Sequence, residues 1–266
     1  MTEARLDARN VWVEYFIARS RERFVALQDV SLQVNDGEFV SFLGPSGCGK
    51  TTMLNAIDGL KRVTRGEIRI DGKAVTKPGK DRAMVFQSAA LLPWRTVLGN
   101  VVYGLELQGM DVNVSRARAR ELIKLVGLAG FEERYPNELS GGMQQRVNIA
   151  RALATDPEIL LLDEPFANLD AQTREFMQSE LLRVWAATHK TAIFVTHNIV
   201  ESVYLSDRVV VFTARPGRVK EIVNIDLVRP RPLKIKRSPE FLQYEEHIWE
   251  SLQDEIAKTG LFVNAA

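Results

Sequence analysis

The sequence has one cysteine, no long apolar run and almost no net charge, and each of these absences argues against a class of protein. Cys48 has no second cysteine with which to form an internal disulfide, which indicates a reducing compartment. No stretch approaches the roughly 20 consecutive apolar residues that a membrane-crossing helix needs. The formal net charge of +1 gives no support for nucleic-acid binding, which usually requires a strong basic bias.

The remaining composition is that of an ordinary globular protein. The 266 residues are 45% hydrophobic and 26% charged, which suits one domain of common size with an appendage. Residues 1–6 lack the apolar core of a secretory signal, so we expect no such signal. No internal repeat or low-complexity run is present.

A glycine-rich segment has the spacing of a phosphate-binding loop. It fits the pattern G-x-x-x-x-G-K-[ST] at every fixed position, with Gly44, Pro45, Ser46, Gly47, Cys48, Gly49, Lys50 and Thr51. The backbone N–H groups of such a loop converge on phosphate oxygens, and the following helix adds its positive end. Lys50 would reach the β- and γ-phosphates, and the Thr51 hydroxyl would bind Mg²⁺.

The context of this loop argues against a chance match in a glycine-rich turn. Residues 38–43 are typical of a strand that enters the loop. After the loop, apolar residues recur at helical spacing, at Met53, Leu54, Ile57 and Leu60. The order of strand, loop and helix is the one that phosphate binding requires, so the sequence predicts a nucleotide site here.

Two adjacent acids, Asp163 and Glu164, follow the apolar run at residues 159–162. This run shows no alternation, as expected of a strand that is buried on both faces of a parallel sheet. At the carboxyl end of such a strand, Asp163 would hold the Mg²⁺ hydration shell and Glu164 would align and polarise an attacking water. The alternative is that both acids are solvated loop residues.

With these motifs in this order, the chain resembles the nucleotide-binding subunits of ATP-binding cassette (ABC) transporters over about residues 7–230. Residues 139–146 read Leu-Ser-Gly-Gly-Met-Gln-Gln-Arg, which is similar to the signature motif of that family. The resemblance implies ATP and Mg²⁺ as ligands and hydrolysis of ATP. It also implies a P-loop NTPase (RecA-like) α/β fold, with a mostly parallel sheet core, an antiparallel β subdomain and a helical subdomain that carries the signature motif.

The resemblance assigns roles to further residues. Gln87 matches the Q-loop glutamine, which contacts Mg²⁺ and the water, and His197 matches the switch histidine beside the γ-phosphate. The metal ligands would then be Thr51, Gln87 and Asp163, and the catalytic group would be Glu164, His197, Gln87 and Lys50. The remaining nucleotide contacts would come from Thr52 and, in the signature and D-loop motifs, from Ser140, Gly141, Gly142, Gln144 and Asp170.

Two of these roles have a physical reason in the residues themselves. Ser140 precedes a predicted helix, so its hydroxyl is a candidate N-cap. Small residues at a helix N-terminus also form an anion site. His197 follows the apolar strand predicted at residues 192–195, which places its imidazole at the same sheet edge as Glu164.

Two motifs depart from the family pattern. Ala167 and Asn168 stand where the D-loop commonly has Ser-Ala or Gly-Ala before Leu169 and Asp170, which affects the expected coupling between subunits. Tyr15 holds the place of the aromatic residue that stacks on adenine. Because residues 16–24 intervene before the next motif, Phe16 and Phe24 are alternatives.

A stretch after the Q-loop indicates the partners. Residues 91–97 read Leu-Leu-Pro-Trp-Arg-Thr-Val, where importers of the family form a groove for the transmembrane permease subunits. An exposed Trp94 would anchor the coupling helix of the permease in that groove. The alternative is that Leu92 and Trp94 pack inside the helical insert. The family mechanism also requires a second ABC ATPase subunit, expected to be identical, whose signature loop closes over the nucleotide.

The Leu-Leu-Pro-Trp stretch, with residues 214–218 and 229–232, resembles the nitrate/taurine/aliphatic sulfonate importer branch. The resemblance implies import of a small anion, powered from the cytoplasmic face of the bacterial inner membrane, with a periplasmic or lipoprotein solute-binding protein as an indirect partner. Import of a pyrimidine precursor or aromatic acid is an alternative, as is a soluble ABC ATPase that acts as a mechanical clamp. Multidrug export and a P-loop kinase agree less well with the motifs.

The order of segments predicts the domain organisation. Residues 1–230 form the ABC ATPase domain, with a helical subdomain at about 88–155 in which a helix over 116–126 ends at Gly127. Residues 231–266 form a C-terminal extension with one amphipathic helix that begins near Ser238 and ends before Gly260. Its apolar stripe, expected to dock on the domain, comprises Phe241, Ile248, Trp249, Leu252 and Ile256. A regulatory or dimer-stabilising role is the alternative.

Overall fold

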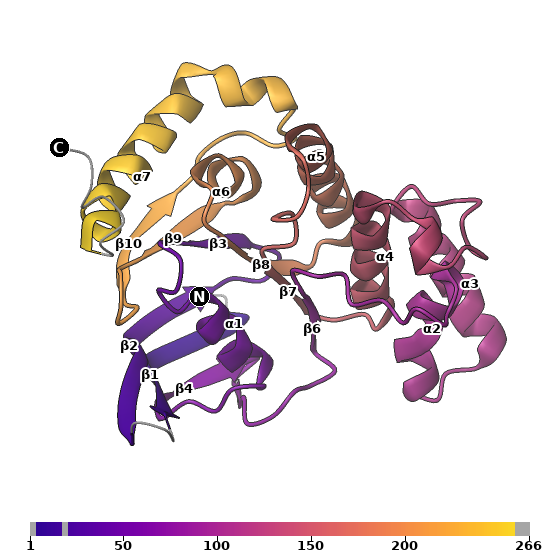
Figure 1. The fold of residues 1–266 in the computed structure, drawn as a ribbon, viewed down its shortest axis with the longest axis horizontal. Coiled ribbons are helices and arrows are strands. Elements are labelled where there is room, and N and C mark those ends of the chain that lie inside the picture. Colours follow the sequence, from indigo (N-terminus) through magenta and orange to yellow (C-terminus); the bar gives the residue numbers. More distant parts are fainter. Residues whose placement is uncertain (1–3, 18–20, 259–266) are drawn as a thin grey trace. The chain divides into compact units, whose positions relative to one another are not determined.

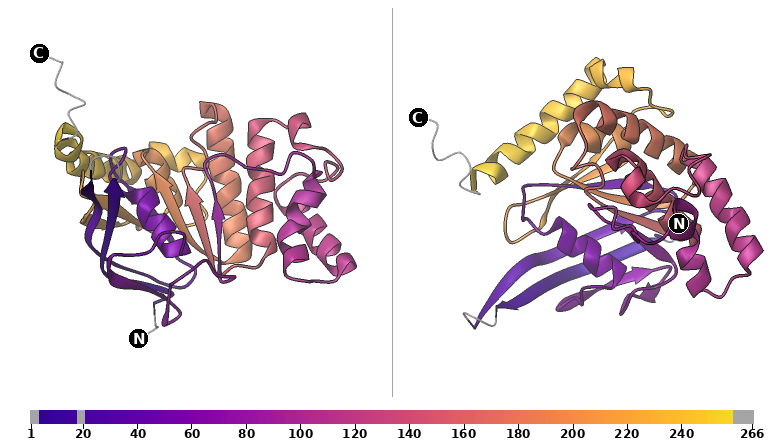
Figure 2. Two further views of the ribbon diagram at one scale, coloured as in Figure 1. Left: turned by 60° about the horizontal axis from the view of Figure 1, so that its bottom comes forward. Right: turned by 45° about the vertical axis from the view of Figure 1, so that its right-hand side comes forward.

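The computed structural model describes residues 4–17 and 21–258, and the chain divides into two compact units. Unit 1 comprises residues 1–79 and 191–266, and unit 2 comprises residues 80–190. Figures 1 and 2 show the elements of each unit along the colour gradient.

Unit 1 contains an antiparallel sheet with the strand order β2-β1-β4-β5. Its strands are β1 (Leu6–Ile17), β2 (Glu22–Val34), β4 (Arg65–Ile70) and β5 (Lys73–Ala74). In β2, buried and exposed residues alternate towards the end of the strand, as expected for a sheet that packs one face on a core.

Unit 1 also contains the strands that enter the phosphate-binding loop and the His197 segment. Strand β3 (Phe39–Leu43) pairs in parallel with β8 (Thr191–Thr196) and with β9 (Arg208–Phe212), and β10 (Val219–Asn224) pairs antiparallel with β9. Every residue of β3 and β8 is buried, which explains why their sequences are apolar without alternation.

The helices of unit 1 are α1 (Lys50–Asp58), α6 (Ile199–Leu205), the 3-10 helix η2 (Leu233–Arg237) and α7 (Pro239–Lys258). Helix α1 ends at Gly59, whose φ of 88° suits a residue without a Cβ. Leu60 therefore lies beyond the helix and is exposed, so the prediction that it continues the helix is wrong.

Helix α7 lies along α6 and β9 (Figure 1), and three members of its predicted stripe are buried there: Phe241, Ile248 and Leu252. Trp249 is 43% exposed, so its inclusion in the docked stripe is wrong. One residue after Ile248, it is turned about 100° around the helix axis. The expected helix end before Gly260 lies outside the described residues.

Arg231 fixes the segment that leads into α7. Its guanidinium is buried and donates to backbone carbonyl oxygens of Val203, Tyr204 and Ser206 at 2.8–3.1 Å, at the carboxyl end of α6. A cation at the end of a helix interacts favourably with the helix dipole. Desolvation lowers the pKa of Arg231 to about 10, so the side chain is still charged at neutral pH.

Unit 2 contains two parallel strands and four α-helices. Strand β6 (Arg82–Val85) pairs with β7 (Ile159–Asp163). The helices are α2 (Val97–Leu107), α3 (Val112–Leu125), α4 (Gly141–Ala154) and α5 (Ala171–Thr188), with the 3-10 helix η1 (Pro136–Glu138) before α4. Helices α2, α3 and α4 pack against one another (Figure 2).

Helix α3 begins earlier than the sequence predicts. The Asp111 side chain accepts hydrogen bonds from the N–H groups of Asn113 and Val114 and caps the helix, so Val112 is its first residue instead of Arg116.

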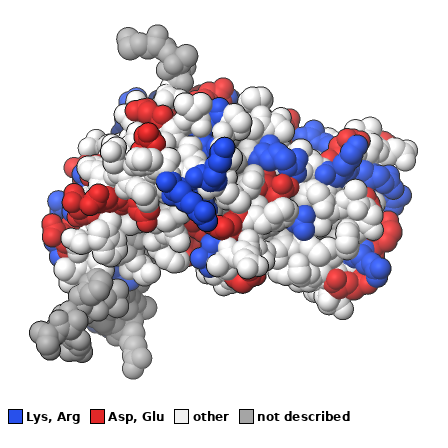
Figure 3. All heavy atoms as spheres, turned by 90° about the horizontal axis from the view of Figure 1, so that it is seen from above, with Lys and Arg blue, Asp and Glu red and all other residues white. Residues whose placement is uncertain are grey.

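Across residues 4–17 and 21–258, no helix combines the length and apolar character that a membrane crossing requires. On the face seen in Figure 3, basic and acidic side chains both occur among uncharged ones, in line with the small net charge.

Candidate functional site

The phosphate-binding loop follows β3 in unit 1 and requires glycine at several positions. Gly47 and Gly49 have φ values of 74° and 106°, which suit residues without a side chain. A Cβ at Gly44 would lie 2.9 Å from Cys48 Sγ and 3.0 Å from the Phe212 carbonyl oxygen, so only glycine fits there. The loop then leads directly into α1, whose first residue is Lys50. The loop and the N-terminus of this helix are thus adjacent, in the order that the sequence predicts for a phosphate site.

Lys50 bridges the loop from its inside. Its side chain is buried, and Nζ donates to the carbonyl oxygens of Gly44 at 2.7 Å and Pro45 at 3.0 Å. Cys48 Sγ lies 3.8 Å from the same nitrogen. Burial raises the pKa of the Cys48 thiol, and the nearby Lys50 ammonium only partly offsets this effect. Lys50 Nζ therefore lies at the centre of the loop, bonded to two of its carbonyl oxygens.

The His197 segment lies at the same sheet edge as the phosphate-binding loop. Strands β3 and β8 are parallel, and Leu43 is paired with Thr196, so Gly44 and His197 both leave the sheet at this point. Thr196 Oγ1 donates to Glu201 Oε2 at 2.6 Å and accepts from the Asn198 N–H at 3.0 Å. The residues on both sides of His197 are thus fixed, while His197 itself is exposed.

Tyr15 lies over the start of α1. Its hydroxyl is 3.4 Å from Thr52 Oγ1, and the Lys61 ammonium lies 3.7 Å from its ring centroid. In the antiparallel pair β1–β2, Tyr15 is paired with Phe24, so both side chains lie on one face of the sheet. Phe16, the next residue in the strand, points to the opposite face.

In unit 2, the acidic pair and Gln87 lie at one sheet edge. Strands β6 and β7 are parallel, with Val85 paired to Leu162, so Gln87 and the acids Asp163 and Glu164 both follow the carboxyl ends of neighbouring strands. Both acids are partly buried, and Gln87 is exposed. This is the arrangement in which parallel strands commonly present polar groups to a ligand.

Glu164 has a backbone conformation that the sequence does not reveal. Its φ is 43°, in the left-handed region that residues with a Cβ rarely adopt. Its carbonyl oxygen accepts a hydrogen bond from the Ala167 N–H at 3.1 Å, which closes a turn after β7. Such a conformation costs about 1–3 kcal/mol and is often found at functional sites, where the surrounding structure maintains it.

Helix α4 holds the Q-loop in place through residues that the sequence analysis missed. Gln145 Nε2 and Asn148 Nδ2 each lie 3.5 Å from the Phe86 carbonyl oxygen, directly before Gln87. Arg151 donates to the carbonyl oxygens of Ala89 and Ala90 at 3.0 and 2.9 Å. These contacts join residues about 60 positions apart. The only signal for them in the sequence was that Gln145, Asn148 and Arg151 recur at helical spacing.

The signature loop forms the start of α4, as predicted. The Ser140 side chain accepts a hydrogen bond from the Met143 N–H at 3.3 Å, so the predicted N-cap is confirmed. Ser140 and Gly141 are exposed, and a Cβ at Gly142 would lie 3.0 Å from Thr173 Cγ2 of α5. The Gln144 side chain donates to the carbonyl oxygens of Pro136 and Leu139. The Gln144 side chain therefore holds the signature loop against the segment that precedes it.

Asp170 caps α5. Its carboxylate accepts a hydrogen bond from the Thr173 N–H at 3.0 Å. Hydrogen bonds from the Thr173 side chain and from backbone N–H groups lower the pKa of Asp170. The D-loop residues Ala167 and Asn168 lie between Glu164 and this cap, and Asn168 is exposed.

Each unit thus brings part of the predicted site together. Unit 1 holds the phosphate-binding loop, Tyr15 and His197, and unit 2 holds Gln87, Asp163 and Glu164 at one sheet edge and the signature and D-loops at the starts of α4 and α5. Among residues 4–17 and 21–258, no group of three or more His, Cys, Asp or Glu side chains could hold a metal ion.

Comparisons with known proteins agree with these motifs. The sequence profile of the family described as "ABC transporter" matches residues 27–167. An uncharacterized ABC transporter ATP-binding protein of Methanocaldococcus jannaschii is 57% identical over 237 residues, which are 89% of this chain and 88% of that protein. A taurine import ATP-binding protein of Burkholderia pseudomallei is 44% identical over 257 residues, 95% of this chain and 98% of that protein.

A solved structure shares the fold. It is a dimeric, post-hydrolysis state of an ATP-binding cassette bound to ADP and Pi, with a TM-score of 0.73 and 36% identity. The match covers 84% of this chain and all of that one. The predicted P-loop NTPase fold class is therefore confirmed.

The chain belongs to the ABC transporter family and is one of its ATP-binding, ATP-hydrolysing subunits. Within the family, its relatives place it in the taurine/sulfonate importer branch, as the sequence predicts.

Proposed function

We propose that this subunit dimerises and powers the import of a small sulfonate, with taurine as the first candidate. The observation that supports this most directly is the identity of 44–48% to taurine import ATP-binding proteins over 88–95% of the chain. Nitrate is a second candidate anion, and a pyrimidine precursor or an aromatic acid is the alternative cargo. The subunit would lie on the cytoplasmic face of the bacterial inner membrane and would meet its solute-binding protein only through the permease.

The residues at the two sheet edges suggest how the chain binds and hydrolyses ATP. Lys50 and the N–H groups of the loop from Gly44 to Thr52 bind the phosphates, because their positive ends converge on one place. Glu164 orients and polarises the attacking water, and His197 donates a hydrogen bond to the γ-phosphate. Most of the acceleration comes from positioning and from stabilisation of charge in the transition state.

The candidate metal ligands suit Mg²⁺. Thr51 offers a hydroxyl, Gln87 an amide oxygen and Asp163 a carboxylate, and these hard oxygen donors are the ones that Mg²⁺ takes together with substrate phosphates. A site with one carboxylate also agrees with the way Mg²⁺ is held in nucleotide enzymes. When bound, Mg²⁺ neutralises part of the phosphate charge.

Tyr15 is the proposed adenine platform. It lies next to Thr52 at the start of α1, and Lys61 contacts its ring. Phe16 points to the opposite face of the strand, and Phe24 lies 5.3 Å from the Arg215 guanidinium. Among these rings, the contact of Tyr15 with Thr52 of α1 favours it as the platform.

A second copy of the chain would complete the site. Ser140 and Gly141 are exposed at the N-terminus of α4, where backbone N–H groups can cap a phosphate held by another copy. ATP would then stabilise the closed dimer, and hydrolysis would release it. This cycle would move the permease between its two states.

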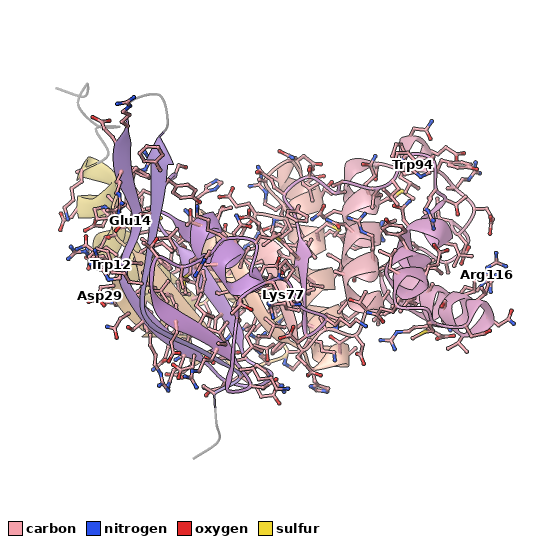
Figure 4. The ribbon with its side chains drawn as sticks, turned by 90° about the horizontal axis from the view of Figure 1, so that it is seen from below. Trp12, Glu14, Asp29, Lys77, Trp94 and Arg116 are labelled. Carbon is pink, nitrogen blue, oxygen red and sulfur yellow. The ribbon has the colours of Figure 1, made fainter. Side chains whose placement is uncertain are left out.

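The turn that carries Trp94 is built as a rigid anchor. Trp94 is 72% exposed, which supports contact with a partner over packing inside the helical insert (Figure 4). The buried side chain of Asn100 exchanges hydrogen bonds with the backbone of Leu92 and donates to the carbonyl oxygens of Arg95 and Thr96. The turn on both sides of Trp94 is thereby fixed, so little entropy is lost when a partner binds.

A cavity of about 640 Å³ lies next to this turn in unit 2. It is lined by Pro93 and by residues of the 130–138 stretch, among them Glu132, Glu133 and Glu138. Arg134 also lines this cavity and pairs with Glu138 at 2.8 Å, so the lining holds three acids and one base. An aromatic anchor beside a groove with this excess of acid suits a permease helix with apolar and basic side chains.

Replacement of Trp94 by alanine is expected to lower the affinity for the permease at least about tenfold, since exposed aromatic anchors dominate such interfaces. Less permease should therefore co-purify with the variant. ATP binding should not change, because the Asn100 hydrogen bonds keep the turn intact. Leu107→Ala is the control, since Leu107 is equally exposed, at 73%, on the neighbouring helix α2. Unchanged assembly of Trp94→Ala would remove this part of the proposal.

The cargo is tested with the complex of this subunit, its permease and its solute-binding protein in proteoliposomes. Taurine-loaded binding protein is expected to raise ATP hydrolysis several-fold over the unloaded protein, while nitrate and an aromatic acid do so less. Stimulation by another solute would keep the importer but reassign its cargo. Assembly with DNA or ribosomes in place of a permease would favour the mechanical clamp.

A further inference from the structure

The loop between β9 and β10, residues 213–218, contacts the phosphate-binding loop through Arg215. Arg215 Nε donates to the carbonyl oxygen of Gly47 at 2.6 Å. A Cβ at Gly47 would lie 2.4 Å from Arg215 Nη2, so the guanidinium fills the space beside this residue. No motif in the sequence assigns Arg215 a role in the chemistry, and it lies 168 residues from Gly47.

This hydrogen bond controls the direction of one peptide group in the phosphate-binding loop. In a trans peptide, the carbonyl oxygen and the following N–H point in opposite directions. Since Arg215 holds the Gly47 oxygen, the Cys48 N–H points to the other side, where it donates to the Pro45 carbonyl oxygen at 3.3 Å. Arg215 therefore fixes this turn and keeps the Gly47 acceptor away from the inside of the loop, which suits an anionic ligand.

The backbone of the 213–218 loop is itself fixed against strand β2 and the phosphate-binding loop. The Gly217 N–H donates to the Ala26 carbonyl oxygen, and the Gly217 carbonyl oxygen accepts from the Gln28 N–H, both at 2.9 Å. A Cβ at Gly217 would lie 2.0 Å from the Cys48 carbonyl oxygen, so the two backbones are in direct contact. The Arg215 guanidinium also lies 5.3 Å from the Phe24 ring centroid, in reach of a cation–π contact.

Helix α7 holds the same loop from the other side. The Glu255 carboxylate accepts a hydrogen bond from the Ala214 N–H at 2.8 Å, one residue before Arg215. This carboxylate is 3% exposed, and Lys258 and Lys220 lie 2.7 and 3.3 Å from it. Burial opposes the charged form, but the hydrogen bonds from Lys258, Ala214 and Lys220 outweigh it and lower the pKa of Glu255. Glu255 is therefore a stable anion at neutral pH.

A cavity of about 640 Å³ separates α7 from the phosphate-binding loop elsewhere. Its lining includes Ser46 and Cys48 of that loop, and Glu255 and Lys258 of α7. The path from α7 to the phosphate-binding loop thus runs along Glu255, Ala214, Arg215 and Gly47.

We propose that Arg215 is a positioning residue of the phosphate-binding loop and that helix α7 holds Arg215 in place through Glu255 and Ala214. This inference rests on the proposal that the loop binds ATP. It gives the C-terminal helix a role in setting the affinity for ATP, through contacts within one copy of the chain.

The test measures ATP affinity, KM and kcat of the full chain with Arg215 replaced. Arg215→Ala is expected to raise Kd and KM for ATP about tenfold, the loss of one charge-assisted hydrogen bond. The value of kcat should change less than about twofold, because the residues that act on the water and γ-phosphate are elsewhere. Arg215→Lys should recover most of the affinity, since an ammonium can still donate to the Gly47 oxygen.

Arg218→Ala is the matched control. Arg218 is an exposed arginine three residues further along the same loop, and its replacement should leave KM and kcat unchanged. A merely structural role would lower the melting temperature of Arg215→Ala without a separate effect on KM. Unchanged KM in Arg215→Ala, a loss confined to kcat, or an equal loss in Arg215→Lys would each overturn the proposal.

The contribution of α7 is tested with Glu255. Glu255→Ala is expected to raise KM about threefold, and the effect should be largely absent when Arg215 is already alanine, because both act along one path. Glu255→Gln keeps an oxygen that can accept from the Ala214 N–H, so its KM should stay near that of the native chain. Additive effects of the two alanine replacements would overturn the role of α7.

Lys50→Ala distinguishes a failure of the Arg215 inference from a failure of the proposed ATP site. If Lys50→Ala abolishes ATP binding and Arg215→Ala does not alter it, the loop is the ATP site and only the Arg215 inference is wrong. If Lys50→Ala binds ATP as the native chain does, the assignment of the loop fails first.

Discussion

Replacement of Glu164 by glutamine is expected to slow ATP hydrolysis by about 10²- to 10⁴-fold, the range for loss of a group that accepts or directs a proton. Glutamine has the same shape and can take the same left-handed backbone, but its amide cannot act as a base. Glu164 lies at the end of β7, one residue from Asp163, and the strained turn holds it there. ATP binding should persist, because Lys50 and the phosphate-binding loop are unchanged.

The measurement is phosphate release in a single turnover, together with the oligomeric mass with and without Mg-ATP. If hydrolysis reopens the dimer, Glu164→Gln should accumulate as an ATP-dependent dimer, while the native chain does so only transiently. Glu121→Gln, an exposed acid on α3, is the control and should behave like the native chain.

Two other outcomes would change the conclusion. Normal hydrolysis in Glu164→Gln would show that another group activates the water. A monomer under every condition, with hydrolysis lost, would assign the carboxylate but show that closure of the dimer needs the permease.

The parts of the fold that follow from local sequence were predictable. The apolar run that forms β7 is buried along its length, and its lack of alternation correctly indicated a parallel strand. The runs that form β3 and β8 were predicted as strands, and both are fully buried. Ser140 was expected to cap a helix, and its hydroxyl does accept from the Met143 N–H. The apolar run of a strand and the N-cap of a helix both depend on residues close together in the sequence, so a local pattern is enough to predict them.

Predictions of element ends and of exposed faces were less accurate. Helix α3 starts at Val112 because Asp111 caps it, a signal that precedes the basic stretch on which the prediction relied. The period alone placed Leu60 in a helix and Trp249 in a docked stripe, but Leu60 lies beyond α1 and both side chains are exposed. The apolar character of a residue does not show whether another element covers it.

The contacts that position the site could not be read from the sequence. Arg215 reaches Gly47 across 168 residues, and Arg151 reaches Ala89 across 62. The left-handed conformation of Glu164 and the Asn100 hydrogen bonds that fix the Trp94 turn also depend on the folded chain. A single sequence identifies the residues of the chemistry, because their types and spacing are specific, but not the residues that hold them.

Replacement of Lys50 by alanine is expected to weaken ATP binding by at least about 100-fold, or roughly 3 kcal/mol, since an ammonium that bonds two phosphates makes charge-assisted contacts in a buried place. In the structure, Nζ already bonds the carbonyl oxygens of Gly44 and Pro45. The alanine variant would leave both carbonyl oxygens without this donor. Its melting temperature should therefore fall as well, and binding must be measured below that temperature.

The measurement is an ATP titration of the folded variant, with Lys73→Ala as the control, an exposed lysine on β5 of the same unit. ATP affinity close to that of the native chain in Lys50→Ala would exclude the lysine as a phosphate ligand.

A third variant, Lys50→Arg, separates charge from geometry. Arginine keeps the positive charge, but its planar guanidinium is larger than the ammonium that fits between two backbone carbonyl oxygens about 3 Å away. If only the charge attracts ATP, Lys50→Arg should bind nearly as well as the native chain. We expect it to bind almost as poorly as Lys50→Ala, because the loop is shaped around an ammonium that can exchange its carbonyl partners for phosphate oxygens without moving the backbone.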